Sequence, residues 1–217
     1  MNEPICRRSG NVFRLFTIRR NAMVAGCGSL AFGFLVTGCH TSPAPAPTTI
    51  CESLDTLTPG ARAVVGVPPV NSFQPPTMDI GARPFTWANG TSTSTGYAEI
   101  QSGNKAGGSG NEMQVNNILV TFSTGFGQTM ETLRFSFGEY GGNLNLWINN
   151  QFTNFNNFAD INGAIIGGVQ VNVLSGGNGN DKGQIEFVGH MVDQAGGRGQ
   201  LAVGGQELWI DDVCFKK

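Results

Sequence analysis

Hydrophobic and polar residues alternate in short runs over the second half of the chain, and clusters of glycine and asparagine separate these runs. A period of two is typical of a β-strand with one face toward a core, whereas a helix repeats its apolar positions every three to four residues. No window of helical period extends beyond a few residues. The runs that predict strands are EMQVNNILVTF, TLRFSFG, NLNLWIN, GGVQVNVL, GQIEFVGHMV, GQLAV and ELWIDDVCF.

Turn signals between the runs favour an antiparallel arrangement. The Asn-Gly pairs at 89–90 and 162–163 and the run GGNGNDKG suit hairpin-type turns, because these residues tolerate positive φ. A proline-rich segment, residues 67–94, is expected to be mostly loop. We therefore predict an all-β fold, an antiparallel β-sandwich (jelly roll).

Alternation also predicts which side chains face outward. In NLNLWIN the leucines and the isoleucine take core positions, which leaves Asn145, Trp147 and Asn149 on the opposite face. The same rule puts Arg134 outside in TLRFSFG and Trp209 outside in ELWIDD. An exposed indole can stack on the C–H face of a sugar ring while amide or guanidinium groups bond its hydroxyls. These five residues are the predicted carbohydrate-binding platform; alternatively, the proline-rich segment covers either tryptophan and makes it a packing residue.

Other aromatic and glycine-rich motifs have simpler interpretations. Phe152, Phe155 and Phe158 recur at every third residue, and either line a groove or plug one end of the sandwich. The run GGNGNDKGQ resembles one calcium-binding nonapeptide of β-roll repeats, with Asp181 at the ligand position. Because such repeats work by stacking and Gly183 replaces an apolar residue, a hairpin turn is the simpler interpretation.

The sequence offers no constellation for catalysis. It contains no G-x-S-x-G motif, and its two histidines, His40 and His190, suggest neither a metal cluster nor a catalytic triad. Asp211 and Asp212 are adjacent in a predicted strand and should point to opposite faces, which argues against a glycosidase pair. We therefore predict a noncatalytic protein without a metal site, with a hydrolase as the third hypothesis.

The first 38 residues have the layout of a bacterial export signal. Arginines precede an uncharged, glycine-containing run, and residues 36–39, Val-Thr-Gly-Cys, resemble a lipobox. The resemblance implies that residues 1–38 are removed and that Cys39 is lipidated, which anchors the protein to a bilayer. The alternative is an ordinary secretory signal. Arg19 and Arg20 also resemble a twin-arginine signal, although their neighbours depart from that pattern.

The exported part divides into a tether and one domain. Residues 39–50 are rich in Pro, Ala and Thr and predict an extended tether. Residues 51–217 form the predicted sandwich domain, and outside the cytoplasm Cys51 and Cys214 should form a disulfide that joins its ends. The formal net charge is −2 and becomes more negative without the arginine-rich leader, which argues against nucleic acid as a partner.

Three strand motifs, GGQELWIDDVCF, GEYGGNLNLWINN and GGVQVNV, resemble strands of galactose-binding-like jelly rolls. The resemblance implies the fold and a tendency to bind carbohydrate or protein surfaces. Such folds often carry one structural calcium ion, but no ligands can be assigned here. We expect a lipoprotein of the bacterial cell envelope, with His40 after the lipidated cysteine favouring the outer membrane. Its expected partner is a glycan; the alternative is a structural or assembly lipoprotein that docks an envelope protein.

Overall fold

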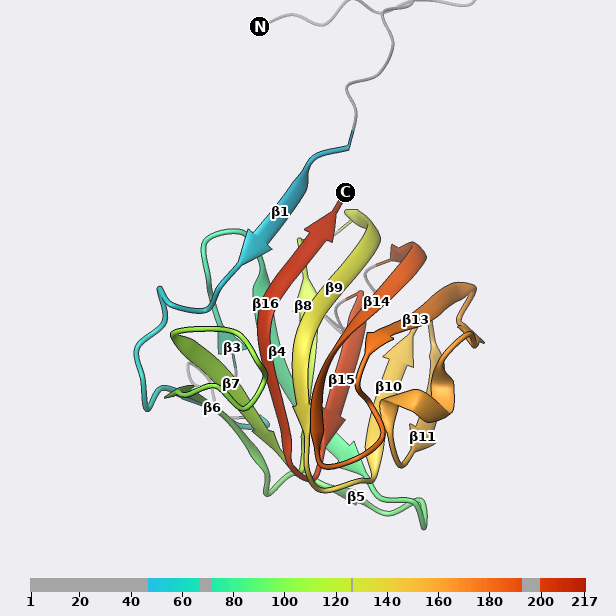
Figure 1. Cartoon of the computed structure of the whole chain (residues 1–217), viewed down its shortest axis with the longest axis horizontal. Helices are drawn as coiled ribbons and strands as arrows, with labels where there is room; N and C mark the ends of the chain where they lie inside the picture. The colour runs from blue at the N-terminus through green and yellow to red at the C-terminus, as the bar shows by residue number, and fades with distance from the viewer. Residues whose placement is uncertain (1–46, 67–71, 126, 193–199) are drawn as a thin grey trace, which may run out of the picture. The chain divides into compact units, whose positions relative to one another are not determined.

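The computed structural model describes residues 47–66, 72–125, 127–192 and 200–217. These residues form two antiparallel β-sheets that pack face to face, which confirms the all-β sandwich (Figure 1). The predicted signal segment 1–38 and the lipidation residue Cys39 lie outside the described residues. The first strand begins at Thr49, so the last two residues of the predicted tether range belong to the sheet.

The larger sheet has nine strands among the described residues. Its strands follow the order β12-β13-β14-β9-β16-β7-β6-β2, and β1 pairs with the end of β16 beyond its contact with β7. Their bounds are β1 Thr49–Glu52, β2 Arg62–Ala63, β6 Tyr97–Ser102, β7 Asn111–Asn116, β9 Thr129–Glu139, β12 Ile165–Ile166, β13 Val169–Ser175, β14 Asp181–Val192 and β16 Leu208–Lys216.

The smaller sheet has seven described strands in the order β11-β10-β15-β8-β4-β3, with β5 paired to β4. A short 3-10 helix, η1 (Phe158–Ile161), follows β11. The strand bounds are β3 Ser72–Phe73, β4 Asp79–Thr86, β5 Ser92–Thr93, β8 Ile118–Ser123, β10 Leu144–Ile148, β11 Gln151–Phe155 and β15 Leu201–Gly205.

The core lies between the sheets and follows the predicted alternation. Leu133, Phe135 and Phe137 of β9 are fully buried, as are the leucines and the isoleucine of β10. Each such side chain contributes about 1.5–3 kcal/mol through removal of apolar surface from water. Phe155 and Phe158 are buried in this core and pack against each other at a centroid distance of 5.6 Å, which favours packing over a groove for these two residues.

One predicted strand proves to be two strands in different sheets. The run EMQVNNILVTF breaks at Asn117, which has a φ of 51° and separates β7 from β8. The backbone N–H of Asn117 donates to Gly205 O at 2.9 Å. Asparagine tolerates this left-handed conformation better than other residues with a Cβ. The chain therefore passes from one sheet to the other within a single residue.

The expectation of a loop over residues 67–94 is wrong for much of its described part. Residues 79–86 form β4, which pairs with β8 along six positions. Gly81 and Pro84 disfavour a strand by propensity, but Ile80 lies fully buried in the core and fixes the strand there. The Asn89-Gly90 turn is as expected, since it joins β4 to β5 and Gly90 has a φ of 83°.

The predicted disulfide between Cys51 and Cys214 is present. It joins directly opposed positions of β1 and β16, the first and last strands of the domain. Nearby, the buried carboxylate of Glu52 accepts a hydrogen bond from the backbone N–H of Thr77 at 2.9 Å. The disulfide and this carboxylate together hold β1 to the rest of the sandwich.

Candidate functional site

The five residues of the predicted platform do not come together. Asn145, Trp147 and Asn149 belong to β10 and its end in the seven-stranded sheet, whereas Arg134 and Trp209 lie on β9 and β16 of the nine-stranded sheet. All five occupy positions that alternate with core residues, so the two groups lie toward opposite outer faces of the sandwich. A single ligand cannot bridge them across the core, and the prediction of one platform is wrong.

Trp209 is on the predicted face but is not exposed. Only 3% of its surface is accessible, because residues 103–110 fold back over the outer face of its sheet. The Lys105 ammonium of this loop lies 4.1 Å from the centroid of the indole. Tyr140, which directly follows β9, makes an edge contact with the indole at a centroid distance of 5.3 Å. The indole Nε1 has no hydrogen-bond partner. The packing alternative therefore holds for Trp209, with a different covering segment from the one expected.

Asn145 is fully buried and holds the chain instead of facing solvent. Its Oδ1 accepts a hydrogen bond from the Thr86 backbone N–H at 2.9 Å, and its Nδ2 donates to Thr86 O at 2.9 Å. The side-chain amide thus pairs with the end of β4 as a neighbouring strand would. The prediction that Asn145 faces a ligand is wrong, and its polarity is explained by this backbone pairing.

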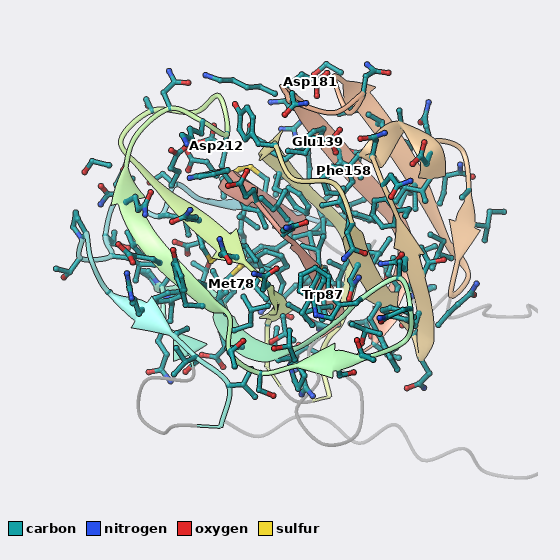
Figure 2. All side chains as sticks on the ribbon, turned by 90° about the horizontal axis from the view of Figure 1, so that it is seen from below. Met78, Trp87, Glu139, Phe158, Asp181 and Asp212 are labelled. Atoms are coloured by element: carbon teal, nitrogen blue, oxygen red, sulfur yellow. A yellow bond between two sulfur atoms is a disulfide. The ribbon has the colours of Figure 1, made fainter. Side chains whose placement is uncertain are left out.

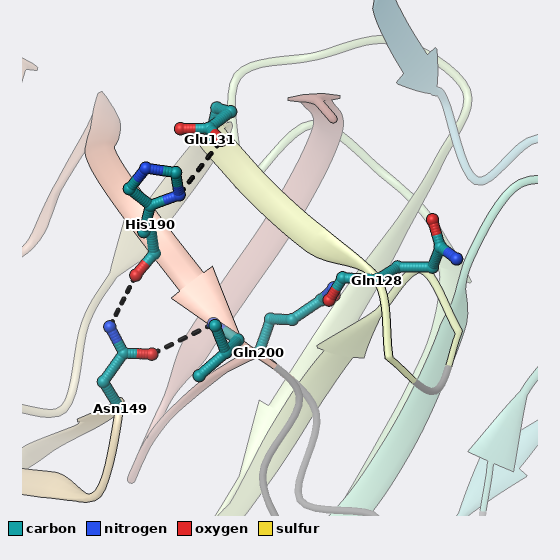
Figure 3. A network of polar contacts seen from close by, with 6 residues as sticks. Gln128, Glu131, Asn149, His190 and Gln200 are labelled. Atoms are coloured by element: carbon teal, nitrogen blue, oxygen red, sulfur yellow. Dashed lines mark hydrogen bonds and ion pairs between the residues drawn. The ribbon is translucent and has the colours of Figure 1, made fainter. Parts of the chain in front are cut away.

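Asn149 joins the two sheets at the end of β10. It has a φ of 45°, and its Nδ2 donates to Gly167 O at 2.8 Å and to His190 O at 2.6 Å. Its Oδ1 accepts a hydrogen bond from the backbone N–H of Val192 at 3.0 Å (Figure 3). His190 in turn contacts Glu131 at 3.1 Å through Nδ1. These hydrogen bonds hold the side-chain amide of Asn149 in contacts within the protein, which argues against its predicted role in binding a sugar.

Arg134 is exposed, as expected, on the outer face of the nine-stranded sheet. Its position on β9 is opposite Glu186 of β14 and Cys214 of β16. A small hollow of about 110 Å³ beside it is lined by Thr49, Thr132, Arg134, Glu186, Cys214 and Lys216. This hollow contains no aromatic ring among its lining residues, so it cannot provide the stacking surface that the sugar hypothesis requires.

Of the two tryptophans of the predicted platform, Trp147 is the one that stays accessible. It is partly exposed on the outer face of the seven-stranded sheet and contacts the Phe152 ring at a centroid distance of 5.7 Å. Strand register places Phe152, Trp147, Ala202 and Thr121 in one row across four strands. The small side chains beside the indole leave a groove of about 200 Å³. The groove is lined by Arg83, Pro84, Thr86, Leu119, Trp147, Phe152 and Ala202.

Most of these groove residues were not predicted from the sequence. Arg83 and Thr86 come from β4, which was not predicted, and Leu119 lies in a continuous apolar run without alternation. Backbone pairing of β4 with β8 places Arg83 opposite Leu119. The alternation of Ile80 and Ala82 with outward residues was the available signal, but the glycine and proline of β4 obscured it.

A second aromatic surface adjoins this groove. Trp87 contacts Phe85 edge-on at 5.2 Å, and both Trp87 and Trp147 pack against the cluster of Phe85, Leu119 and Ala202. A shallow hollow beside Trp87 is lined by Trp87, Ala88, Asn89, Thr91 and Asn143. Figure 2 shows Trp87 on the side of the sandwich away from Asp181 and Asp212. The outer face of the seven-stranded sheet thus carries two partly exposed indoles.

The outer face of the nine-stranded sheet instead carries carboxylates beneath the 103–110 loop. Glu112 and Asp211 are buried, and Glu112 Oε2 accepts a hydrogen bond from Ala106 N–H at 2.7 Å. Burial first, and then the charges of Asp212, Asp55 and Glu112, raise the pKa of Asp211 to about 7, against a hydrogen bond from the Asp212 N–H that lowers it.

The expectation that Asp211 and Asp212 point to opposite faces is wrong. The ladder of β16 is interrupted between Asp211 and Cys214, and Asp212 has a φ of 50°. A Cβ on Gly108 would lie 2.0 Å from Asp211 Oδ2 and 3.0 Å from Asp212 Oδ2, so both carboxylates approach the same loop. Asp211 is nevertheless only 1% exposed, so a substrate cannot reach the pair in this arrangement.

Another buried carboxylate, Glu139, has a structural role. It accepts hydrogen bonds from Phe158 N–H at 3.0 Å and Gly179 N–H at 2.6 Å, and Figure 2 shows it beside Phe158. Burial raises its pKa, although these two hydrogen bonds act in the opposite direction. Asp181 accepts hydrogen bonds from its own turn, at Gly177 and Asn178, which fits the hairpin interpretation.

In the described part of the chain, no group of three or more His, Cys, Asp or Glu residues is arranged to hold a metal ion. Nor is any helix there long and apolar enough to cross a membrane. Comparisons with protein-family models, curated proteins and solved structures found no match. The groove beside Trp147 therefore has to be interpreted from its own geometry.

Proposed function

We propose that this protein is a noncatalytic lipoprotein of the bacterial cell envelope whose β-sandwich binds carbohydrate. The observation that carries the proposal is the open groove beside Trp147, in which Phe152 extends the aromatic wall. Of the five residues first assigned to binding, Trp147 keeps this role, and Arg83 and Thr86 replace the amides as the polar groups of the groove.

The chemistry of the groove suits a sugar ring. A pyranose presents a C–H face that stacks on an indole, and its hydroxyls at the ring edge require hydrogen-bonding partners. Thr86 and Arg83 line the same groove and supply a hydroxyl and a guanidinium. Ala202 leaves the space beside the indole unfilled, because a methyl group is the whole of its side chain.

The test is glycan binding by the purified protein and its Trp147→Ala variant. Loss of the stacking ring should weaken binding by about tenfold or more. Trp209→Phe is the matched control, because Trp209 lies beneath the 103–110 loop on the other sheet. Equal glycan binding by the parent and Trp147→Ala would remove the proposal. Bound oligosaccharides should keep their length on incubation, and shortening would instead favour a hydrolase.

The anchoring part of the proposal depends on Cys39. A thioether-linked lipid at this cysteine, with its additional acyl chains, would hold the domain at a membrane surface, most simply the outer membrane. Metabolic labelling with an alkyne fatty acid should mark the parent protein and not Cys39→Ser. Labelling of both proteins to the same extent would reject Cys39 as the lipidated residue.

A second candidate, an assembly lipoprotein that docks a protein partner, is favoured by exposed apolar side chains on β12, β13 and β14. Ile165 and Val188 are 67% and 39% exposed, and both are paired with Gln170, so they share one outer face. Leu174 and Val192 are also exposed. Cross-linking in intact cells that is lost in Ile165→Glu but kept in Trp147→Ala would favour this candidate over carbohydrate binding.

A further inference from the structure

We infer that the hollow beside Trp87 is a second subsite, for a neutral sugar residue, so that the protein binds an oligosaccharide chain instead of a single sugar. The inference rests on the proposed carbohydrate function and adds a site to it. It follows from an indole held in a fixed position, from two side-chain amides beside it, and from the uncharged lining of the hollow.

The hairpin between β4 and β5 holds Trp87 in place. The Trp87 backbone N–H donates to Thr91 O at 2.8 Å across the hairpin. At its base, the side-chain amide of the buried Asn145 makes hydrogen bonds to both the N–H and the carbonyl of Thr86. The indole itself packs edge-on against the buried Phe85 ring. A ligand therefore meets an aromatic surface that is already ordered, which lowers the entropic cost of binding.

The hollow has the size and composition of a sugar subsite. Its volume is about 490 Å³, and it is lined by Trp87, Ala88, Asn89, Thr91 and Asn143. Trp87 and Asn143 are partly exposed, and Asn89 and Thr91 are exposed. An indole stacks on the C–H face of a pyranose, while amides and hydroxyls beside it bond the sugar hydroxyls. None of these five residues is charged, which favours a neutral sugar over a charged one.

The two amides of the hollow use their oxygens within the protein. Asn89 Oδ1 accepts hydrogen bonds from the Thr91 backbone N–H at 3.0 Å and from the Thr91 hydroxyl at 2.7 Å. Asn143 Oδ1 accepts a hydrogen bond from Asn154 Nδ2 at 2.7 Å, and this nitrogen also donates to Leu144 O. These partners fix which amide atom is the oxygen. The Nδ2 groups of Asn89 and Asn143 are therefore the atoms left to donate to hydroxyl and ring oxygens of a sugar.

The hollow and the groove beside Trp147 are neighbours on one surface. Thr86 lines the groove, and Trp87, the next residue, lines the hollow. Both indoles also pack against the same cluster, which consists of Phe85, Leu119 and Ala202. A chain of sugar residues that lies over this cluster can contact both indoles, whereas a single ring fills one site.

The test measures affinity against chain length. Neutral oligosaccharides of increasing length, from cellulose, xylan and mannan, are titrated by calorimetry against the full-length protein. Occupation of the second subsite adds a stacking contact and its hydrogen bonds, so affinity in at least one series should rise about tenfold from short to long members. In an NMR titration of the unaltered protein, the long member should shift the Trp87 indole N–H signal and the side-chain amide signals of Asn89 and Asn143.

Substitution of Trp87 should remove the dependence on length. Long and short members should bind Trp87→Ala with similar affinity, and Trp87→Phe should keep part of the gain because it retains a ring. Trp209→Phe is the control and should follow the parent at every length, since Trp209 lies beneath the 103–110 loop on the other sheet.

Three results would overturn the second subsite and leave the carbohydrate function standing. These are an affinity that does not rise with length, a gain with length that Trp87→Ala retains, and binding that does not move the Trp87, Asn89 and Asn143 signals. Binding of acidic glycans alone would likewise reject a neutral subsite. Absence of binding to every neutral and acidic glycan would overturn both the subsite and the carbohydrate function.

Discussion

Replacing Asp211 with asparagine tests whether the buried carboxylates beneath the 103–110 loop limit the stability of the fold. Asp211 is 1% exposed, and its pKa is raised to about 7 by burial and by the charges of Asp212, Asp55 and Glu112. Asparagine has nearly the same shape, and its Oδ1 can still accept the hydrogen bond that Asp211 Oδ1 receives from the Asp212 N–H at 2.7 Å. The substitution therefore removes the charge and keeps the hydrogen bond.

The sign of the effect follows from linkage. Aspartate in an unfolded chain titrates near pH 4, so the unfolded state loses its proton first as the pH rises. The free energy of unfolding should therefore fall between about pH 4 and pH 7 and stay constant above that range. A pKa that rises from 3.8 to about 7 corresponds to a loss on the order of 4 kcal/mol at 1.36 kcal/mol per pKa unit. Asp211→Asn should escape this loss.

Urea unfolding of the parent and Asp211→Asn at about pH 4, 6 and 8 measures the effect, with the disulfide left intact. The two proteins should have similar stability at the lowest pH, and the variant should be more stable at the highest. Glu139, whose pKa is also raised, contributes the same trend to both proteins and cancels in the difference. Asp79→Asn, at an exposed position on the other sheet, is the control. A constant difference between parent and Asp211→Asn at every pH would refute the reasoning.

Three further variants test how the sheets and loops are held. Asn145→Ala removes both hydrogen bonds to the end of β4 and should lower the free energy of unfolding by about 2 kcal/mol, seen as a lower urea midpoint. Cys51→Ser combined with Cys214→Ser should cost about 3–5 kcal/mol, and an unchanged midpoint would contradict a stabilising bridge. Gly138→Ala would place a Cβ 2.1 Å from the Lys105 carbonyl oxygen, so it should displace the 103–110 loop and shift tryptophan fluorescence to longer wavelength.

The alternation of side chains predicted the faces of the strands but not what covers them. Trp209 and Trp147 both occupy outer positions, as the period of two requires. Trp209 is buried because the 103–110 loop, remote in sequence from β16, packs on it. Trp147 stays partly exposed because the residues beside it on β15 and β8, Ala202 and Thr121, are small, a property of other strands brought beside it by sheet register.

The backbone conformation at Asp212 also breaks the alternation of side-chain faces along β16. Asp212 adopts a positive φ at an interruption of the ladder, which brings its carboxylate to the same loop as that of Asp211. A bulge of this kind inserts one residue and reverses the faces that follow it. Its position depends on how β16 pairs with both β9 and β1, and pairing partners cannot be deduced from the residues of β16 alone.

The sequence by itself determined the all-β class, the alternation of core and outer residues in the longer strands, and the cysteines that pair. These features depend on the chemistry of each residue and of its near neighbours, which a linear pattern records. The tertiary structure decided that β4 is a strand, that Asn145 pairs with its backbone, and that Arg83 and Trp147 share a groove. These contacts join distant segments, such as Thr86 and Asn145, which are 59 residues apart, and only the pairing of strands brings such segments together.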